Sequence, residues 1–208
     1  MSEACCNPPP PARDVSYRRV LWIALAANAV MFLVELVASL WSGSSALAAD
    51  AADFLGDSAN YAFSLGAIAL GGAWLSRVAL VKGAVMTLYG ISVLGYAGWR
   101  AWLGLPPEPV TMGLVGLLAL SVNFAVAALL YRFREGDANM RSVWLCTRND
   151  VIANLAVIAA AAGVFGTGTV WPDVAVAAVL ALLGLTAGRV VIRQALGELE
   201  ERRGISAH

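Results

Sequence analysis

The sequence predicts an all-α membrane protein of six transmembrane helices. Of its 208 residues, 60% are hydrophobic and only 13% are charged, whereas soluble domains contain about 45–50% apolar and about 25% charged residues. A soluble chain of this composition would expose too much apolar surface, so lipid is the expected solvent. The formal net charge is zero, and no basic patch stands out, which argues against a nucleic-acid partner.

Six segments are long enough to span a bilayer, which takes about 20 mainly apolar residues. The expected spans are 17–41, 46–75, 78–103, 110–131, 140–165 and 171–196. The first run could instead imitate a signal peptide cleaved near Ala48, but it is about twice as long as a signal-peptide core. Residues 1–16 are then a Pro-rich N-terminal tail, 17–196 the transmembrane domain, and 197–208 a short charged tail.

The placement of Lys and Arg predicts the topology. Basic residues precede the first span, flank the 2–3 and 4–5 connections and follow the sixth span. The 1–2 and 5–6 turns have none, and Arg100 alone marks the 3–4 side. Because short basic loops stay in the cytoplasm, we expect both termini to be cytoplasmic, with the chain in the cell membrane.

Carboxylates inside the spans are the main functional signal, since a charge at the bilayer centre costs about 2.5–3.5 kcal/mol on insertion scales. Asp53 and Asp57 have i, i+4 spacing and share one helix face, with Asp50 one turn earlier. In the fifth span, Cys146 and Asp150 repeat this spacing. Two helices that each present two anionic groups can surround one ion.

The predicted metal ligands are therefore Asp53, Asp57, Cys146 and Asp150. Carboxylate oxygens with one thiolate suit four-coordinate Zn²⁺ and, by softness, Cd²⁺, whereas Mg²⁺ and Ca²⁺ do not favour sulfur. The alternative is that one Asp only bonds a neighbouring helix and that Cys146 is a small buried apolar residue.

Other polar residues are candidates for secondary roles. Asn28 and Glu35 share one face of the first span; with Asp50 and Asn123 they are either secondary ion contacts or interhelical hydrogen-bonding groups. Arg148 is expected to point away from the face of Cys146 and Asp150.

Two further candidates are a cysteine pair near the N-terminus and an aspartate at the start of the last span. Cys5 and Cys6 could capture a metal on the cytoplasmic side, or be two reduced thiols in a tail. Asp173, after Trp171-Pro172, is expected in the first turn of its helix, where the helix dipole favours an acid.

These motifs together resemble the cation diffusion facilitator family. The segment 28–35, the Ser-rich turn 42–45 and the Asp53-x-x-x-Asp57 pair are similar to the family's first two helices. Cys146-x-x-x-Asp150 is similar to its second His-x-x-x-Asp motif, with Cys146 at the His position. A cytoplasmic C-terminal domain and a His-rich loop, found in family members, are expected to be absent.

The resemblance implies a secondary transporter, not an enzyme, with no prosthetic group. It would export Zn²⁺, Cd²⁺ or another divalent ion in exchange for protons, as a homodimer. One alternative is a membrane metal sensor or scaffold that does not transport. An intramembrane aspartyl protease is disfavoured, because Gly56-Asp57 matches only part of the Gly-x-Gly-Asp motif.

Overall fold

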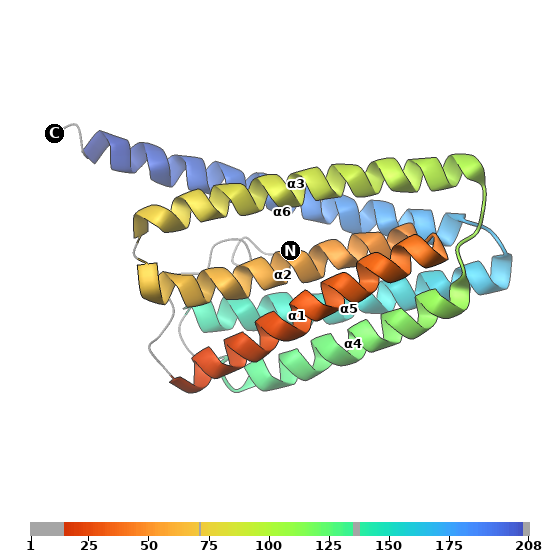
Figure 1. Ribbon diagram of the computed structural model, residues 1–208, viewed down its shortest axis with the longest axis horizontal. Helices are drawn as coiled ribbons and strands as arrows, with labels where there is room; N and C mark the ends of the chain where they lie inside the picture. The colour runs from red at the N-terminus through yellow and green to blue at the C-terminus, as the bar shows by residue number, and fades with distance from the viewer. Residues whose placement is uncertain (1–14, 71, 135–137, 206–208) are drawn as a thin grey trace.

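The computed structural model describes residues 15–70, 72–134 and 138–205, without the side chains of 67–75, 138–143, 145, 146, 148 and 201–205. The described chain contains helices and no strand. The helices are α1 (Val15–Ser42), α2 (Ser45–Leu70), α3 (Gly72–Leu103), α4 (Pro109–Tyr131), α5 (Ala138–Thr167) and α6 (Trp171–Ile205). They lie side by side along one long axis (Figure 1), which confirms the predicted all-α fold of six helices.

The helices have the length and surface of a multi-pass membrane protein. Five contain a stretch apolar enough to cross a bilayer: α1, α4 and parts of α3, α5 and α6. Three aspartates lie in the described part of α2, which is not among these stretches. This acidic helix packs against α1, α3, α5 and α6, while the bundle surface carries exposed apolar side chains such as Leu88, Leu114 and Phe124.

Two helix boundaries differ from the sequence-based expectation. Helix α2 ends at Leu70 and α3 begins at Gly72, so the predicted spans 46–75 and 78–103 placed this boundary too late. Apolar residues continue across it, so a hydropathy pattern does not locate it. Helix α6 continues to Ile205, past the expected end at 196, because Glu, Leu and Arg are good helix formers.

The bundle consists of a four-helix group and a helix pair. Helices α1, α2, α4 and α5 contact one another in the first group, while α3 and α6 make the most extensive contact in the molecule. Gly83 and Gly188 allow this close approach, since a Cβ on Gly188 would lie 3.2 Å from the Gly83 carbonyl oxygen. Figure 1 shows the α3–α6 pair along one side of the other four helices.

Asp173 ties the two groups together at the α1–α2 turn. It lies in the first turn of α6, as expected, and is fully buried. Its carboxylate accepts hydrogen bonds from the hydroxyls of Ser44 and Ser45, both at 2.6 Å, and from the backbone N–H groups of Ser45 (2.8 Å) and Ala46 (3.0 Å). An acid of α6 therefore caps the N-terminus of α2, whose first N–H groups have no partner within the helix.

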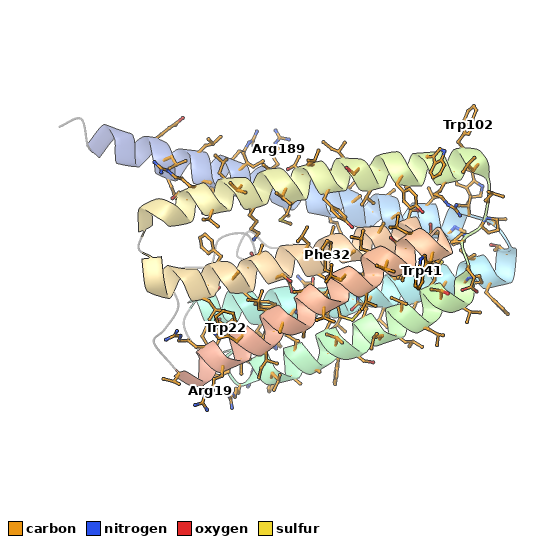
Figure 2. The ribbon with its side chains drawn as sticks, viewed as in Figure 1. Arg19, Trp22, Phe32, Trp41, Trp102 and Arg189 are labelled. Atoms are coloured by element: carbon orange, nitrogen blue, oxygen red, sulfur yellow. The ribbon has the colours of Figure 1, made fainter. Side chains whose placement is uncertain are left out.

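The two ends of the bundle carry different side chains. Trp41 and Trp102 are highly exposed at the end that holds the α1–α2 turn, whereas Arg19 lies at the opposite end (Figure 2). Interfacial Trp and cytoplasmic Arg are typical of membrane proteins. At the Trp end, Glu108 caps α4 by accepting hydrogen bonds from the backbone of Val110 (2.9 Å) and Thr111 (2.6 Å). Hydrogen bonds from Thr111 and Val110 lower the pKa of Glu108.

Candidate metal site

The acidic face of α2 meets α5 inside the four-helix group. Asp57 is buried and Asp53 is half-buried on α2. The carboxylates of Asp57 and Asp150 interact directly across the α2–α5 interface. Asp53 lies near enough to interact electrostatically with both. The fold thus brings together three of the predicted ligands, two from α2 and one from α5.

The acids of this interface are only partly supplied with hydrogen-bond donors. Asp57 Oδ2 accepts a hydrogen bond from the Tyr61 hydroxyl at 3.1 Å. Asp150 Oδ2 is buried and accepts none from the described residues. A buried carboxylate oxygen without a donor is costly, so this arrangement fits a cation that would be held between the two helices.

Tyr61 and Thr147 are neighbours of the site that the sequence reading did not single out. The Tyr61 hydroxyl is buried and lies 2.8 Å from Thr147 Oγ1, which links α2 to α5 next to Asp57. The signal available in the sequence was spacing, because Tyr61 follows Asp57 by one helical turn and shares its face. These hydroxyls orient the Asp57 carboxylate.

Lys82 brings a positive charge to the same acids from α3. Its ammonium donates a hydrogen bond to Asn60 Oδ1 on α2 and interacts electrostatically with Asp57. The side chain also lines an apolar cavity of about 370 Å³ between α2 and α3. In the sequence, Lys82 indicates only the topology, because no neighbouring residue shows that its side chain reaches the acidic face of another helix.

Some predicted metal-binding groups fall outside the described part of the structure. Cys5 and Cys6 lie outside the described residues, and so do the side chains of Cys146 and Arg148. The backbone of residue 146 is helical, one turn before Asp150. Among the described side chains, no group of three or more His, Cys, Asp or Glu residues is close enough to hold a metal ion. The side chain of Cys146 is outside this set.

A second polar cluster connects four helices beside the acidic face. Asn154 of α5 donates a hydrogen bond to Asp50 Oδ2 at 2.7 Å, and Asn123 of α4 donates one to Asn154 Oδ1 at 2.9 Å. Glu35 of α1 interacts directly with Asp50. One cluster therefore contains three of the predicted secondary residues: Glu35, Asp50 and Asn123. Asn154, which links Asn123 to Asp50, was not among the predicted contacts.

Asn28 is the remaining predicted secondary residue, and its described contact is within its own helix. Its amide nitrogen donates a hydrogen bond to the Ala24 carbonyl oxygen at 2.8 Å. Its side chain is fully buried. No described hydrogen bond joins it to the Glu35–Asp50 cluster, so the shared helix face of Asn28 and Glu35 does not by itself bring their side chains together.

Comparisons with known proteins agree with this architecture. The model of the cation efflux transmembrane domain matches residues 21–199. Among curated relatives, the metal cation efflux system protein CzcD of Cupriavidus metallidurans is 27% identical over 197 residues, covering 88% of this chain and 62% of the relative. The zinc transporter ZitB of Escherichia coli is 27% identical over 206 residues, covering 93% of this chain and 66% of the relative.

A third relative has a name that includes the counter-ions. The cadmium, cobalt and zinc/H(+)-K(+) antiporter of Bacillus velezensis is 25% identical over 202 residues, which cover 89% of this chain and 64% of that protein. The chain therefore spans less than two thirds of the length of these relatives. Because the family match extends over almost all of the transmembrane bundle, the chain belongs to the cation efflux, or cation diffusion facilitator, family.

Proposed function

We propose that this protein exports a divalent transition-metal cation and holds it between α2 and α5 during transport. The observation that carries the proposal is the direct contact of the Asp57 and Asp150 carboxylates inside the bundle, with one Asp150 oxygen lacking a donor among the described residues. The contact is a hydrogen bond that needs a proton on one of the two carboxyls, because two ionised carboxylates repel each other in a low-dielectric interior. A dication between them would balance both charges.

Asp53 and the Cys146 thiolate would complete the ligand set. Carboxylate oxygens with one sulfur favour Zn²⁺ or Cd²⁺, in keeping with relatives whose names include zinc, cadmium and cobalt. A thiol must lose its proton to bind a metal, so binding through Cys146 would be coupled to proton release. Cys5 and Cys6 would serve, at most, to capture metal before it reaches this site.

Exchange of metal for protons would drive the transport cycle. Several adjacent buried carboxylates cannot all be ionised without a cation, so protons would replace the metal when it leaves. In this cycle, α1, α2, α4 and α5 would move as one group against the α3–α6 pair, as helix groups do in alternating access. Two copies of the chain would form a homodimer, as the family resemblance implies.

The orientation of the protein in the membrane follows from the Arg and Trp residues at the two ends of the bundle. Arg residues at the start of α1 and near the end of α6 favour a cytoplasmic position for both termini in the cell membrane. The exposed Trp41 and Trp102 would then mark the outer interface. Export would carry the metal from the Arg end of the bundle toward the α1–α2 turn.

Metal flux into proteoliposomes with an imposed pH gradient tests the proposal. Native protein should move Zn²⁺ and Cd²⁺ in a gradient-dependent manner, and Asp57→Asn should reduce the flux at least about 100-fold, as expected for loss of a metal ligand together with its charge. Glu108→Gln is the matched control, since it removes an exposed acid at the end of the bundle, and it should keep its flux.

Unchanged flux in Asp57→Asn would contradict the proposed site. Saturable metal binding by native protein without any flux would contradict transport and would support the metal sensor or scaffold. Replacing Cys146 by His, the residue of the similar family motif, would then test metal preference, with the Zn²⁺-to-Cd²⁺ flux ratio expected to rise because imidazole is a harder ligand than thiolate.

A further inference from the structure

Glu35 is a buried acid for which the structure supplies no hydrogen-bond donor. It lies in the C-terminal half of α1 and is fully buried, and neither carboxylate oxygen has a hydrogen-bond donor among the described residues. Its direct neighbour is another buried acid, Asp50 of α2. Leaving one carboxylate unpaired in the interior costs several kcal/mol, and placing a second beside it adds repulsion. Among the described residues, no Lys or Arg side chain offsets the charge of either acid.

Asp50 is held in position by amide side chains from the other two helices of the group. Asn154 donates to Asp50 at 2.7 Å, and Asn123 donates to Asn154 at 2.9 Å. All three side chains are buried. The amide nitrogens are thus used to orient the cluster, while Asn123 Oδ1 is buried and accepts no hydrogen bond from the described residues.

Interhelical hydrogen bonding alone does not explain this cluster. The two asparagines make such bonds, but Glu35 can share a hydrogen bond with Asp50 only while one of the two carboxyls holds a proton. No other described group donates to the Glu35 oxygens, and a glutamine there would donate to Asp50 without adding charge. The unpaired atoms are all oxygens: two of Glu35 and one of Asn123. Oxygens of this kind are the ligands of hard cations.

The cluster adjoins the proposed site around Asp57, and Asp53 interacts electrostatically with acids of both, but the two sets of ligands cannot share one ion. Asp50 precedes Asp57 by two helical turns, about 10 Å along α2. One ion with metal–oxygen distances of about 2.0–2.2 Å cannot bind both carboxylates in this helix. Asp50 is nearer to the α1–α2 turn, since α2 begins at Ser45, so the cluster lies beyond the Asp57 site on the way to that turn.

We propose that Glu35 and Asp50, with the amide oxygen of Asn123, form a second cation site that binds a divalent ion through oxygen only. This inference rests on the proposed function in one respect: on the transport path, the second site would receive the metal that leaves Asp57 and Asp150. Without sulfur, it should accept Mn²⁺ more readily than a site that contains Cys146 would.

Binding stoichiometry tests the second site. Full-length protein in lipid nanodiscs is dialysed against radiolabelled Zn²⁺, and bound Mn²⁺ is followed by electron paramagnetic resonance. Native protein should bind two Zn²⁺ per chain, Glu35→Gln and Asp57→Asn one each, and the double variant none. Bound Mn²⁺ should persist in Asp57→Asn and disappear when Glu35→Gln is added.

The control is Ser39→Ala, one turn beyond Glu35 on α1. Ser39 Oγ donates to the Leu36 carbonyl within the same helix, so this variant should keep both ions. Thermal unfolding checks that each variant is folded. If Glu35→Gln does not fold, Asn123→Leu replaces it and should weaken Mn²⁺ binding at least about tenfold, the usual loss when the surroundings of a metal are altered.

The outcomes separate this inference from the proposed function. If native protein transports metal but Asp57→Asn abolishes all saturable binding, the second site is overturned and transport stands. If Zn²⁺ and Mn²⁺ binding are the same in Glu35→Gln as in native protein, the second site is also overturned. Two bound ions that respond to the variants as expected, in a protein without flux, would support the site and contradict transport.

Discussion

The α2–α5 and α3–α6 interfaces both join membrane helices, but one is lined by polar and acidic side chains and the other by small residues. The α3–α6 contact is made by small residues, with Gly83 and Gly188 facing each other. The α2–α5 contact contains the acids Asp57 and Asp150 and the Tyr61–Thr147 hydrogen bond. The α3–α6 packing is completed by atoms of the two helices, whereas the acidic interface leaves Asp150 Oδ2 without a donor among the described residues. Under the proposed function, α2–α5 therefore responds to metal and α3–α6 does not.

The largest expected effect is on metal-induced stability at the acidic interface. With metal at 100 times its dissociation constant, native protein should gain about 2.7 kcal/mol. Asp57→Asn should lose most of this gain, while its metal-free form should have about native stability, because protons already relieve the repulsion with Asp150 when no metal is bound. Thermal unfolding with and without Zn²⁺ measures both. A variant that keeps the full Zn²⁺-induced gain would contradict metal binding at Asp57.

At the α3–α6 interface, we expect a change in stability that does not depend on metal. A Cβ on Gly188 would lie 2.6 Å from Thr87 Oγ1 and 3.2 Å from the Gly83 carbonyl oxygen. Gly188→Ala should therefore destabilise the protein by about 1–3 kcal/mol, with or without metal. Gly184→Ala, one turn earlier, is the control, because no described atom lies within 4 Å of its added Cβ. Equal stability of the two variants would show that this packing is not tight.

The smallest effect is expected at Lys82, which connects the two regions. Its ammonium interacts with Asp57 from α3, so it competes with a bound metal for the same charge. Lys82→Met should raise the apparent Zn²⁺ affinity a few-fold, because the half-buried ammonium no longer offsets the charge of the buried Asp57. Lys82→Arg keeps the charge and should resemble native protein. Calorimetric titration measures the affinities, and weaker binding by Lys82→Met would show that Lys82 assists the metal.

Local patterns were sufficient to predict the helices and the acidic face of α2. Apolar length predicted six spans, and the described chain has six helices, five of which contain a stretch apolar enough to cross a bilayer. The i, i+4 spacing placed Asp53 and Asp57 on one face, because helical spacing depends only on residues close in sequence. The α2–α3 boundary was predicted incorrectly for the same reason, since apolar residues continue through it. The placement of Cys146 opposite these acids stays a prediction.

By itself, the sequence determined that the chain is embedded in lipid, that it forms helices, and that carboxylates lie within them. Composition and helical spacing can both be counted along the chain without knowledge of its packing. Tertiary structure alone decided which side chains meet: Asp173 at the start of α2, Lys82 near Asp57, and Glu35 against Asp50. These pairs come from different helices. Their contact depends on how the helices pack and rotate against one another, and no periodicity within one helix encodes that packing.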